Sequence, residues 1–193
     1  ANVDGRWCLS HATHVTEDET AGMARTGAVA GLCPITEANL GDGTFPAPLF
    51  LAGGGRFGVG SDSNVLIGVA DELRQLEYSH RLHRQARNVM VAPGQSNGRA
   101  LFDAAFSGGG FALGAASTGI QAGGPADFVS LDATHPSLAG KRGDAVLDSW
   151  IFANGTRPDG VWVRGSKVVD GGRHKSRDEI ARRFRKVMME LSA

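Results

Sequence analysis

The chain has 193 residues, of which 41% are hydrophobic and 21% charged, an ordinary composition for a globular protein. Lysine plus arginine and aspartate plus glutamate number 20 each, so the formal net charge is zero, which argues against nucleic acid or an anionic membrane as a partner. No apolar run approaches the roughly 20 residues of a membrane helix, and the opening "ANVDGRW" does not have the pattern of a signal peptide.

The first part of the chain alternates strand-like and helical segments. The strand-like runs are continuously apolar, which is typical of parallel strands covered on both faces; they span 6–13, 28–33 and 56–62. Thr16 and Glu19 have the spacing of a capping box before a helix over 17–26, which should end at Gly27. This order predicts an α/β architecture.

The connections between these segments are also assigned. Residues 34–46 are expected to form a long polar loop, and a short helix should follow it. Residues 67–87 have the periodicity of a long helix, and two shorter helical pieces are expected over 98–106 and 109–117.

The last third of the chain has a different character. Segments 126–132 and 147–154 resemble strands, and 160–172 resembles a hairpin with "RGSK" as its turn. Ser176 and Glu179 have the spacing of a capping box before a basic terminal helix. We expect a domain boundary near residue 121, which separates 1–121 from a small β domain over 122–193.

Two other motifs suggest little chemistry. Gly53, Gly55 and Gly58 match GxGxxG, but they precede a strand instead of opening a helix, so a dinucleotide site is not expected. Cys8 and Cys33 have no CxxC spacing and are expected to be buried free thiols of a cytoplasmic protein.

Histidines and aspartates at strand ends are the candidate site residues. His11 and His14 of "HATH" each favour, on spacing alone, an ordinary core or loop histidine. However, His11 ends one predicted parallel strand and Asp62 ends another, and the carboxyl ends of barrel strands converge on one site. Both side chains would there reach a metal ion or its water, although catalytic zinc needs about three protein ligands. The remaining histidines are not expected to take part; they are His80, His83, His135 and His174.

Four stretches together resemble the formimidoylglutamate deiminase family of the amidohydrolase superfamily. They read "WCLSHATHVTEDE", "GAVAGLCPITEANLGDGTFP", "GRFGVGSDSNV" and "ELRQLEYSHRLHRQARN". The "TEANLGDG" segment is the most specific of them, since "GSDS" with an upstream histidine occurs in many deaminases of the superfamily.

The resemblance implies a (β/α)8 barrel, of which this chain would supply strands six to eight, and part of a small β-sandwich. Asp62 would bind a single zinc ion and shuttle protons, and His11 would flank the attacking water. The reaction would be hydrolysis of N-formimino-L-glutamate to N-formyl-L-glutamate and ammonia, in histidine degradation. The resemblance also implies a cytoplasmic homodimer that acts on a small-molecule substrate.

The family's other metal ligands and much of its substrate-binding set do not match anything here. We therefore expect the chain to be the C-terminal portion of such an enzyme and to be inactive alone, because three strands cannot close a barrel. Two alternatives stay open. One is a related aminohydrolase acting on a purine, pterin or triazine ring, and the other is a non-catalytic remnant.

Overall fold

The computed structural model describes residues 2–63, 66–115, 119–153 and 155–192. The chain forms two compact units, each of which is built from two segments. The first unit comprises residues 1–118 and 140–154, and the second comprises 119–139 and 155–193. The domain boundary near residue 121 stays a prediction.

A three-stranded parallel sheet organises the first unit. Its strands are β1 (Cys8–Ser10), β2 (Val29–Leu32) and β3 (Arg56–Val59), in the order β1-β2-β3. Ala30 of the central strand pairs with Leu9 on one side and with Phe57 on the other. The prediction of parallel strands is confirmed, but coverage on both faces is wrong for β1, whose Cys8 and Ser10 are exposed at the sheet edge; β2 is the most deeply buried strand.

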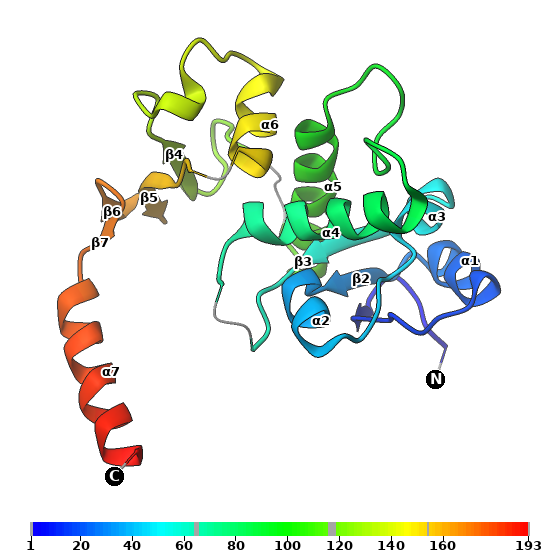
Figure 1. Ribbon diagram of the computed structural model, residues 1–193, viewed down its shortest axis with the longest axis horizontal. Helices are drawn as coiled ribbons and strands as arrows, with labels where there is room; N and C mark the ends of the chain where they lie inside the picture. The colour runs from blue at the N-terminus through cyan, green and yellow to red at the C-terminus, as the bar shows by residue number, and fades with distance from the viewer. Residues whose placement is uncertain (1, 64–65, 116–118, 154, 193) are drawn as a thin grey trace. The chain divides into compact units, whose positions relative to one another are not determined.

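The helix after β1 begins and ends where the sequence predicts. This helix, α1 (Glu17–Thr26), has a complete capping box between Thr16 and Glu19, and Gly27 ends it with φ 74°. Helix α3 (Ala47–Ala52) packs against α1 beside the sheet (Figure 1).

The predicted loop over 34–46 is wrong in its first half. Residues Pro34–Leu40 form helix α2, with proline in its first turn and Gly41 at its end in the left-handed conformation. Proline lacks the N–H that a first helical turn leaves unpaired, and glycine adopts positive φ without strain. Pro34 and Gly41 therefore mark the two ends of a helix whose polar sequence is typical of a loop.

Three further helices complete this unit. Helix α4 (Val69–Arg84) lies within the predicted range 67–87. Helix α5 (Asn97–Ala112) is one continuous helix, so the prediction of two pieces was wrong. Helix α6 (Asp144–Phe152) replaces the strand expected over 147–154.

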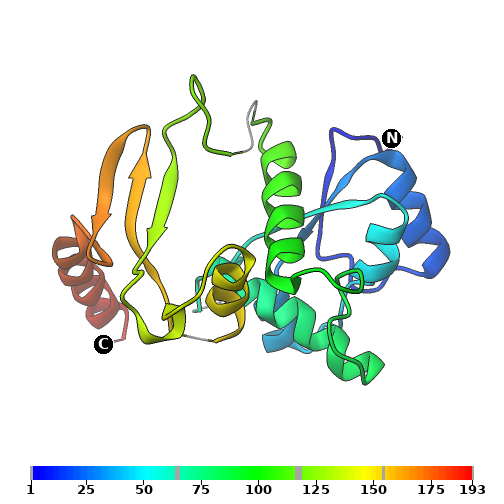
Figure 2. The same ribbon diagram turned by 90° about the horizontal axis from the view of Figure 1, so that it is seen from above.

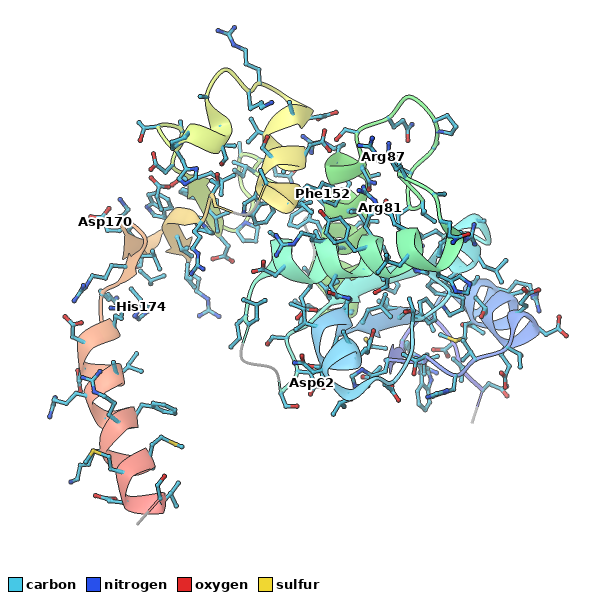
Figure 3. The ribbon with its side chains drawn as sticks, viewed as in Figure 1. Asp62, Arg81, Arg87, Phe152, Asp170 and His174 are labelled. Atoms are coloured by element: carbon cyan, nitrogen blue, oxygen red, sulfur yellow. The ribbon has the colours of Figure 1, made fainter. Side chains whose placement is uncertain are left out.

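The core of the first unit explains why α6 is helical. Ile151 is fully buried, and Trp150 meets Phe102 of α5 edge to face at 6.1 Å. Arg81 of α4 lies 4.9 Å from the ring centroid of Phe152 (Figure 3). A helix presents these successive large side chains to α4 and α5 together. The innermost side chains of this core are Phe45, Phe50, Phe57, Leu32, Leu73, Leu76, Leu101 and Ile151.

The second unit is an antiparallel sheet with a terminal helix. Its strands follow in the order β4 (Phe128–Leu131), β5 (Pro158–Val163), β6 (Ser166–Asp170) and β7 (Arg173–His174), and Figure 2 shows the first three side by side. The predicted hairpin is confirmed, because β5 and β6 pair across a turn at Arg164 and Gly165. A short 3-10 helix, η1 (Pro136–Leu138), follows β4.

The terminal helix is α7 (Arg177–Leu191). Its position is as predicted, but Ser176 makes no side-chain capping bond, so the second capping box is wrong. No helix among the described residues is long and apolar enough to span a lipid bilayer.

Candidate functional site

The carboxyl ends of β1 and β3 bring the two predicted site residues together. His11 directly follows β1, and Asp62 lies in the segment after β3, where it is labelled in Figure 3. Nε2 of His11 stands 3.7 Å from Oδ2 of Asp62, and the two side chains are 37% and 39% exposed. Since β1 and β3 flank β2, the two side chains meet across the end of the central strand.

The backbone turns sharply at both positions. His11, Ala12 and Asp62 have φ values of 60°, 51° and 47°, in the left-handed region that non-glycine residues seldom occupy. The N–H of His11 donates to the carbonyl of Gly31 at 2.9 Å, which ties this turn to β2. Such conformations cost free energy and persist where the surrounding structure imposes them, often at functional sites.

Glu37 is a third member of this candidate cluster, which the sequence analysis missed. It lies on α2, its side chain is only 4% exposed, and its Oε1 stands 3.3 Å from Nδ1 of His11. The same oxygen accepts the N–H of Cys33 at 2.8 Å. Two signals were available: Glu37 follows the central strand, and it lies in the distinctive "TEANLGDG" segment.

Cys33 adds a sulfur atom to the same cluster. One donor atom each from His11, Cys33 and Asp62 lie within 4.8 Å of one another. Burial, with the negative charges of Asp62, Glu37 and Glu72, raises the pKa of the Cys33 thiol to about 11. The prediction of two buried thiols holds in part for Cys33, which is half-buried, and is wrong for Cys8, which is exposed on the edge strand β1.

This cluster is chemically compatible with zinc. Imidazole nitrogen, thiolate sulfur and carboxylate oxygen are the donors that zinc takes in proteins. The raised pKa disfavours the Cys33 thiolate, so the carboxylate of Asp62 is the better candidate of these two for an anionic ligand. His11 points one nitrogen toward Glu37 and the other toward Asp62.

The other histidines lie apart from this cluster. His14 is 82% exposed at its side chain and meets Asp42 at 3.2 Å, and Asp42 also accepts the hydroxyl of Thr13 at 2.8 Å. These two hydrogen bonds hold the pKa of Asp42 below its usual value. His80 and His83 lie on α4, and His135 and His174 belong to the second unit.

Sequence comparison identifies relatives over almost the whole chain. The profile of the amidohydrolase family matches residues 2–168. A formimidoylglutamate deiminase of Pseudomonas aeruginosa is 52% identical over 191 residues, which cover 98% of this chain and 42% of that protein. A 5-methylthioadenosine/S-adenosylhomocysteine deaminase of Nitratidesulfovibrio vulgaris is 31% identical over 69% of this chain and 30% of that protein.

Solved structures share the fold. An amidohydrolase from Brucella melitensis superposes with a TM-score of 0.95 and 58% identity, over 100% of this chain and 43% of that one. A zinc-bound adenosine deaminase from Xanthomonas campestris has a TM-score of 0.80 at 21% identity, over 97% of this chain and 44% of that one. The chain thus spans less than half the length of these relatives. Together these matches show that the chain belongs to the amidohydrolase family.

Proposed function

We propose that the protein containing this chain hydrolyses N-formimino-L-glutamate to N-formyl-L-glutamate and ammonia, with zinc as its metal. The observation that carries the proposal is the 52% identity to a formimidoylglutamate deiminase over nearly the entire chain. The pairing of His11 with Asp62 at the ends of β1 and β3 supports it, because barrel enzymes carry their chemistry at the carboxyl ends of their strands. In this proposal, β1 to β3 are strands six to eight of a (β/α)8 barrel, and the antiparallel sheet is part of a β-sandwich.

Asp62 has the central part in the proposed mechanism. Its carboxylate would hold zinc together with ligands from the rest of the complete protein. Bound zinc supplies Lewis acidity, which makes hydroxide available at neutral pH. Oδ2 of Asp62 would take the two protons of the attacking water in turn and deliver both to the nitrogen that leaves as ammonia.

His11 would flank the same water. Its Nε2 lies 3.7 Å from Asp62, so a water held by the carboxylate stands within reach of the imidazole. The water oxygen bonds to the formimino carbon, the C–N bond to the terminal nitrogen breaks, and a formyl group stays on the glutamate nitrogen. His11 would flank the developing tetrahedral centre and orient the water for attack.

The test is ammonia release from N-formimino-L-glutamate by the complete, zinc-loaded protein. The variants Asp62→Asn and His11→Gln should lose most activity, whereas His14→Gln should keep it, because His14 is exposed and turned toward Asp42. No release from the folded, zinc-loaded protein would exclude this substrate.

A ring aminohydrolase is the second candidate. The 31% identity to the 5-methylthioadenosine/S-adenosylhomocysteine deaminase favours it over other classes of enzyme. A panel containing that protein's two nucleosides, beside N-formimino-L-glutamate, separates the candidates by rate. The predicted homodimer and cytoplasmic location stay predictions.

A further inference from the structure

A buried carboxylate requires a physical reason, and Glu37 has two visible partners. Its side chain is 4% exposed, and its Oε1 accepts the N–H of Cys33 at 2.8 Å while facing Nδ1 of His11 at 3.3 Å. Burying an ionised carboxylate is costly unless hydrogen bonds compensate for the lost water. The imidazole of His11 is therefore one of the groups that make this burial possible.

The two nitrogens of His11 face two different carboxylates. Nδ1 faces the buried Glu37, and Nε2 faces Asp62, which is 39% exposed at its side chain. A carboxylate accepts hydrogen bonds, so the neutral imidazole satisfies Glu37 only when its proton is on Nδ1. The 3.7 Å from Nε2 to Asp62 is too long for a hydrogen bond, so Nε2 then keeps its lone pair on the side of Asp62.

We propose that Glu37 is a positioning residue that holds neutral His11 in its Nδ1–H tautomer and fixes the plane of its ring. The role of His11 toward the attacking water rests on the proposed function, whereas the tautomer itself does not. With the proton on Nδ1, Nε2 accepts a hydrogen bond from the attacking water and orients it. The partner that one imidazole nitrogen has sets the chemistry of the other nitrogen.

The backbone holds both members of this pair in place. The N–H of His11 donates to Gly31 at 2.9 Å, and its φ of 60° directs the chain away from β1. Both the backbone and the side chain of Glu37 bond to Cys33. The N–H of Glu37 donates to the carbonyl of Cys33 at 2.9 Å, and its carboxylate accepts the N–H of Cys33. The Glu37 carboxylate cannot turn without losing the N–H of Cys33, and the His11 ring cannot turn without losing Glu37.

The chain contains a matched pair outside the cluster. His14 meets the carboxylate of Asp42 through Nε2 at 3.2 Å, and it is 82% exposed at its side chain. The same reasoning assigns the opposite tautomer, Nε2–H, to His14 whenever this bond is formed. The two histidines thus provide opposite signals in one sample.

The direct measurement is the tautomer of each histidine in the complete, zinc-loaded protein. Two-bond 15N–1H correlations of 15N-histidine-labelled protein distinguish Nδ1–H from Nε2–H, at a pH above the usual histidine range. His11→Gln and His14→Gln identify the two sets of signals. We expect Nδ1–H at His11, and Nε2–H at His11 would overturn the proposal, whatever the variants of Glu37 do.

Two substitutions of Glu37 separate a positioning role from simple packing. Glu37→Gln keeps an oxygen that the N–H of Cys33 holds in place, so His11 should remain in the Nδ1–H form. Glu37→Met fills similar space without an acceptor, so His11 should change to Nε2–H. The kcat of this second variant should fall about 10–100-fold with little change in KM, as for other outer partners of site histidines.

The matched control is Asp42→Asn, which should leave the His11 tautomer and kcat unchanged. Unaltered tautomer and kcat in a folded Glu37→Met variant would refute the proposal. If Glu37→Met does not fold, the wild-type tautomer still decides. An Nδ1–H signal at His11 in a protein that does not act on N-formimino-L-glutamate would refute the proposed function and leave the tautomer assignment intact.

Discussion

Gly108 of α5 lies directly against the backbone of Phe57 of β3, so closely that an added Cβ would overlap the carbonyl group of Phe57. Gly58, the next residue of β3, has a similar relation to α5, because a Cβ there would stand 3.0 Å from the Cα of Gly109. Helix α5 therefore contacts the strand that leads to Asp62 with bare backbone. The position of this strand relative to the helix depends on the absence of side chains.

Gly108→Ala should consequently destabilise the protein by about 3 kcal/mol, since the clash is with backbone that cannot rotate away. Gly109→Ala is the matched control on the same helix, because a Cβ there meets nothing within 4 Å outside the helix itself. It should stabilise the protein by roughly 0.5–1 kcal/mol, as alanine does in a helix interior. Urea unfolding followed by circular dichroism measures both, and equal stabilities for the two variants would contradict the packing described.

The same contact explains why the sequence was misread as two helices over 98–117. Three consecutive glycines, Gly108, Gly109 and Gly110, have low helix propensity, so local sequence alone predicts that the helix is interrupted there. The segment nevertheless forms one helix that packs closely on β3, and this close approach explains why glycine occupies position 108. The strand predicted over 147–154 failed for a related reason: packing of Trp150 and Ile151 against the neighbouring helices outweighs the local preference of the segment.

The sequence predicted His11 and Asp62 of the candidate site but not Glu37, which lies beside His11. His11 and Asp62 each follow a strand that the sequence shows clearly, so their convergence follows from parallel pairing. Glu37 was hidden because its segment is polar, and it faces inward only when Pro34–Leu40 forms a helix. Its burial depends on the positions of His11 and Cys33, which are set by tertiary structure.

Helix α1 offers a prediction on capping. The hydroxyl of Thr16 accepts the N–H of Glu19 at 3.2 Å, and the carboxylate of Glu19 accepts the N–H of Thr16 at 2.8 Å. Thr16→Ala leaves the N–H of Glu19 without its partner and should cost about 1 kcal/mol. Thr16→Ser keeps the hydroxyl and should lose little of that stability. A loss as large in the serine variant would mean that the methyl group, and not the cap, is responsible.

Glu77 gives a prediction on a buried charge. This fully buried carboxylate accepts four hydrogen bonds, from Nε of Arg81 at 2.7 Å, Nδ2 of Asn97 at 2.8 Å, and the N–H groups of Val89 and Met90 at 2.9 and 3.0 Å. Removing the carboxylate takes this acceptor from all four donors inside the protein, so Glu77→Ala should destabilise the protein by about 3–5 kcal/mol.

The control for Glu77 is an ion pair on the surface of the same unit. Asp103 meets Arg99 at 3.1 Å one helical turn away, with both side chains substantially exposed. Asp103→Ala should change the free energy of unfolding by about 0.5 kcal/mol or less. Comparable losses in Glu77→Ala and Asp103→Ala would show that the four hydrogen bonds of Glu77 stabilise the protein no more than an exposed ion pair does.

His80 leads to a prediction on pH. The residue is 5% exposed, its Nε2 has no hydrogen-bond partner among the described residues, and burial lowers the pKa of the imidazole to about 4. Electrostatic interactions with Arg84 and His83 lower this pKa further, while Glu77 and a hydrogen bond with the backbone of Phe45 oppose the shift. The folded protein therefore keeps His80 neutral at neutral pH.

The unfolded chain binds a proton at this histidine below about pH 6.5, whereas the folded protein does so only near pH 4. The unfolded state thus holds more protons between these values, and stability should fall as the pH decreases through that window. Between pH 7.5 and 5.0 the loss from His80 amounts to about 2 kcal/mol, at 1.36 kcal/mol for each pKa unit. Urea unfolding at the two pH values should show this loss in the wild type and a slightly smaller loss in His83→Gln, which removes one of the lesser causes of the shift. The loss should be much smaller in His80→Gln. An identical pH dependence in all three proteins would mean that His80 is protonated at its ordinary pKa and that α4 does not keep it neutral.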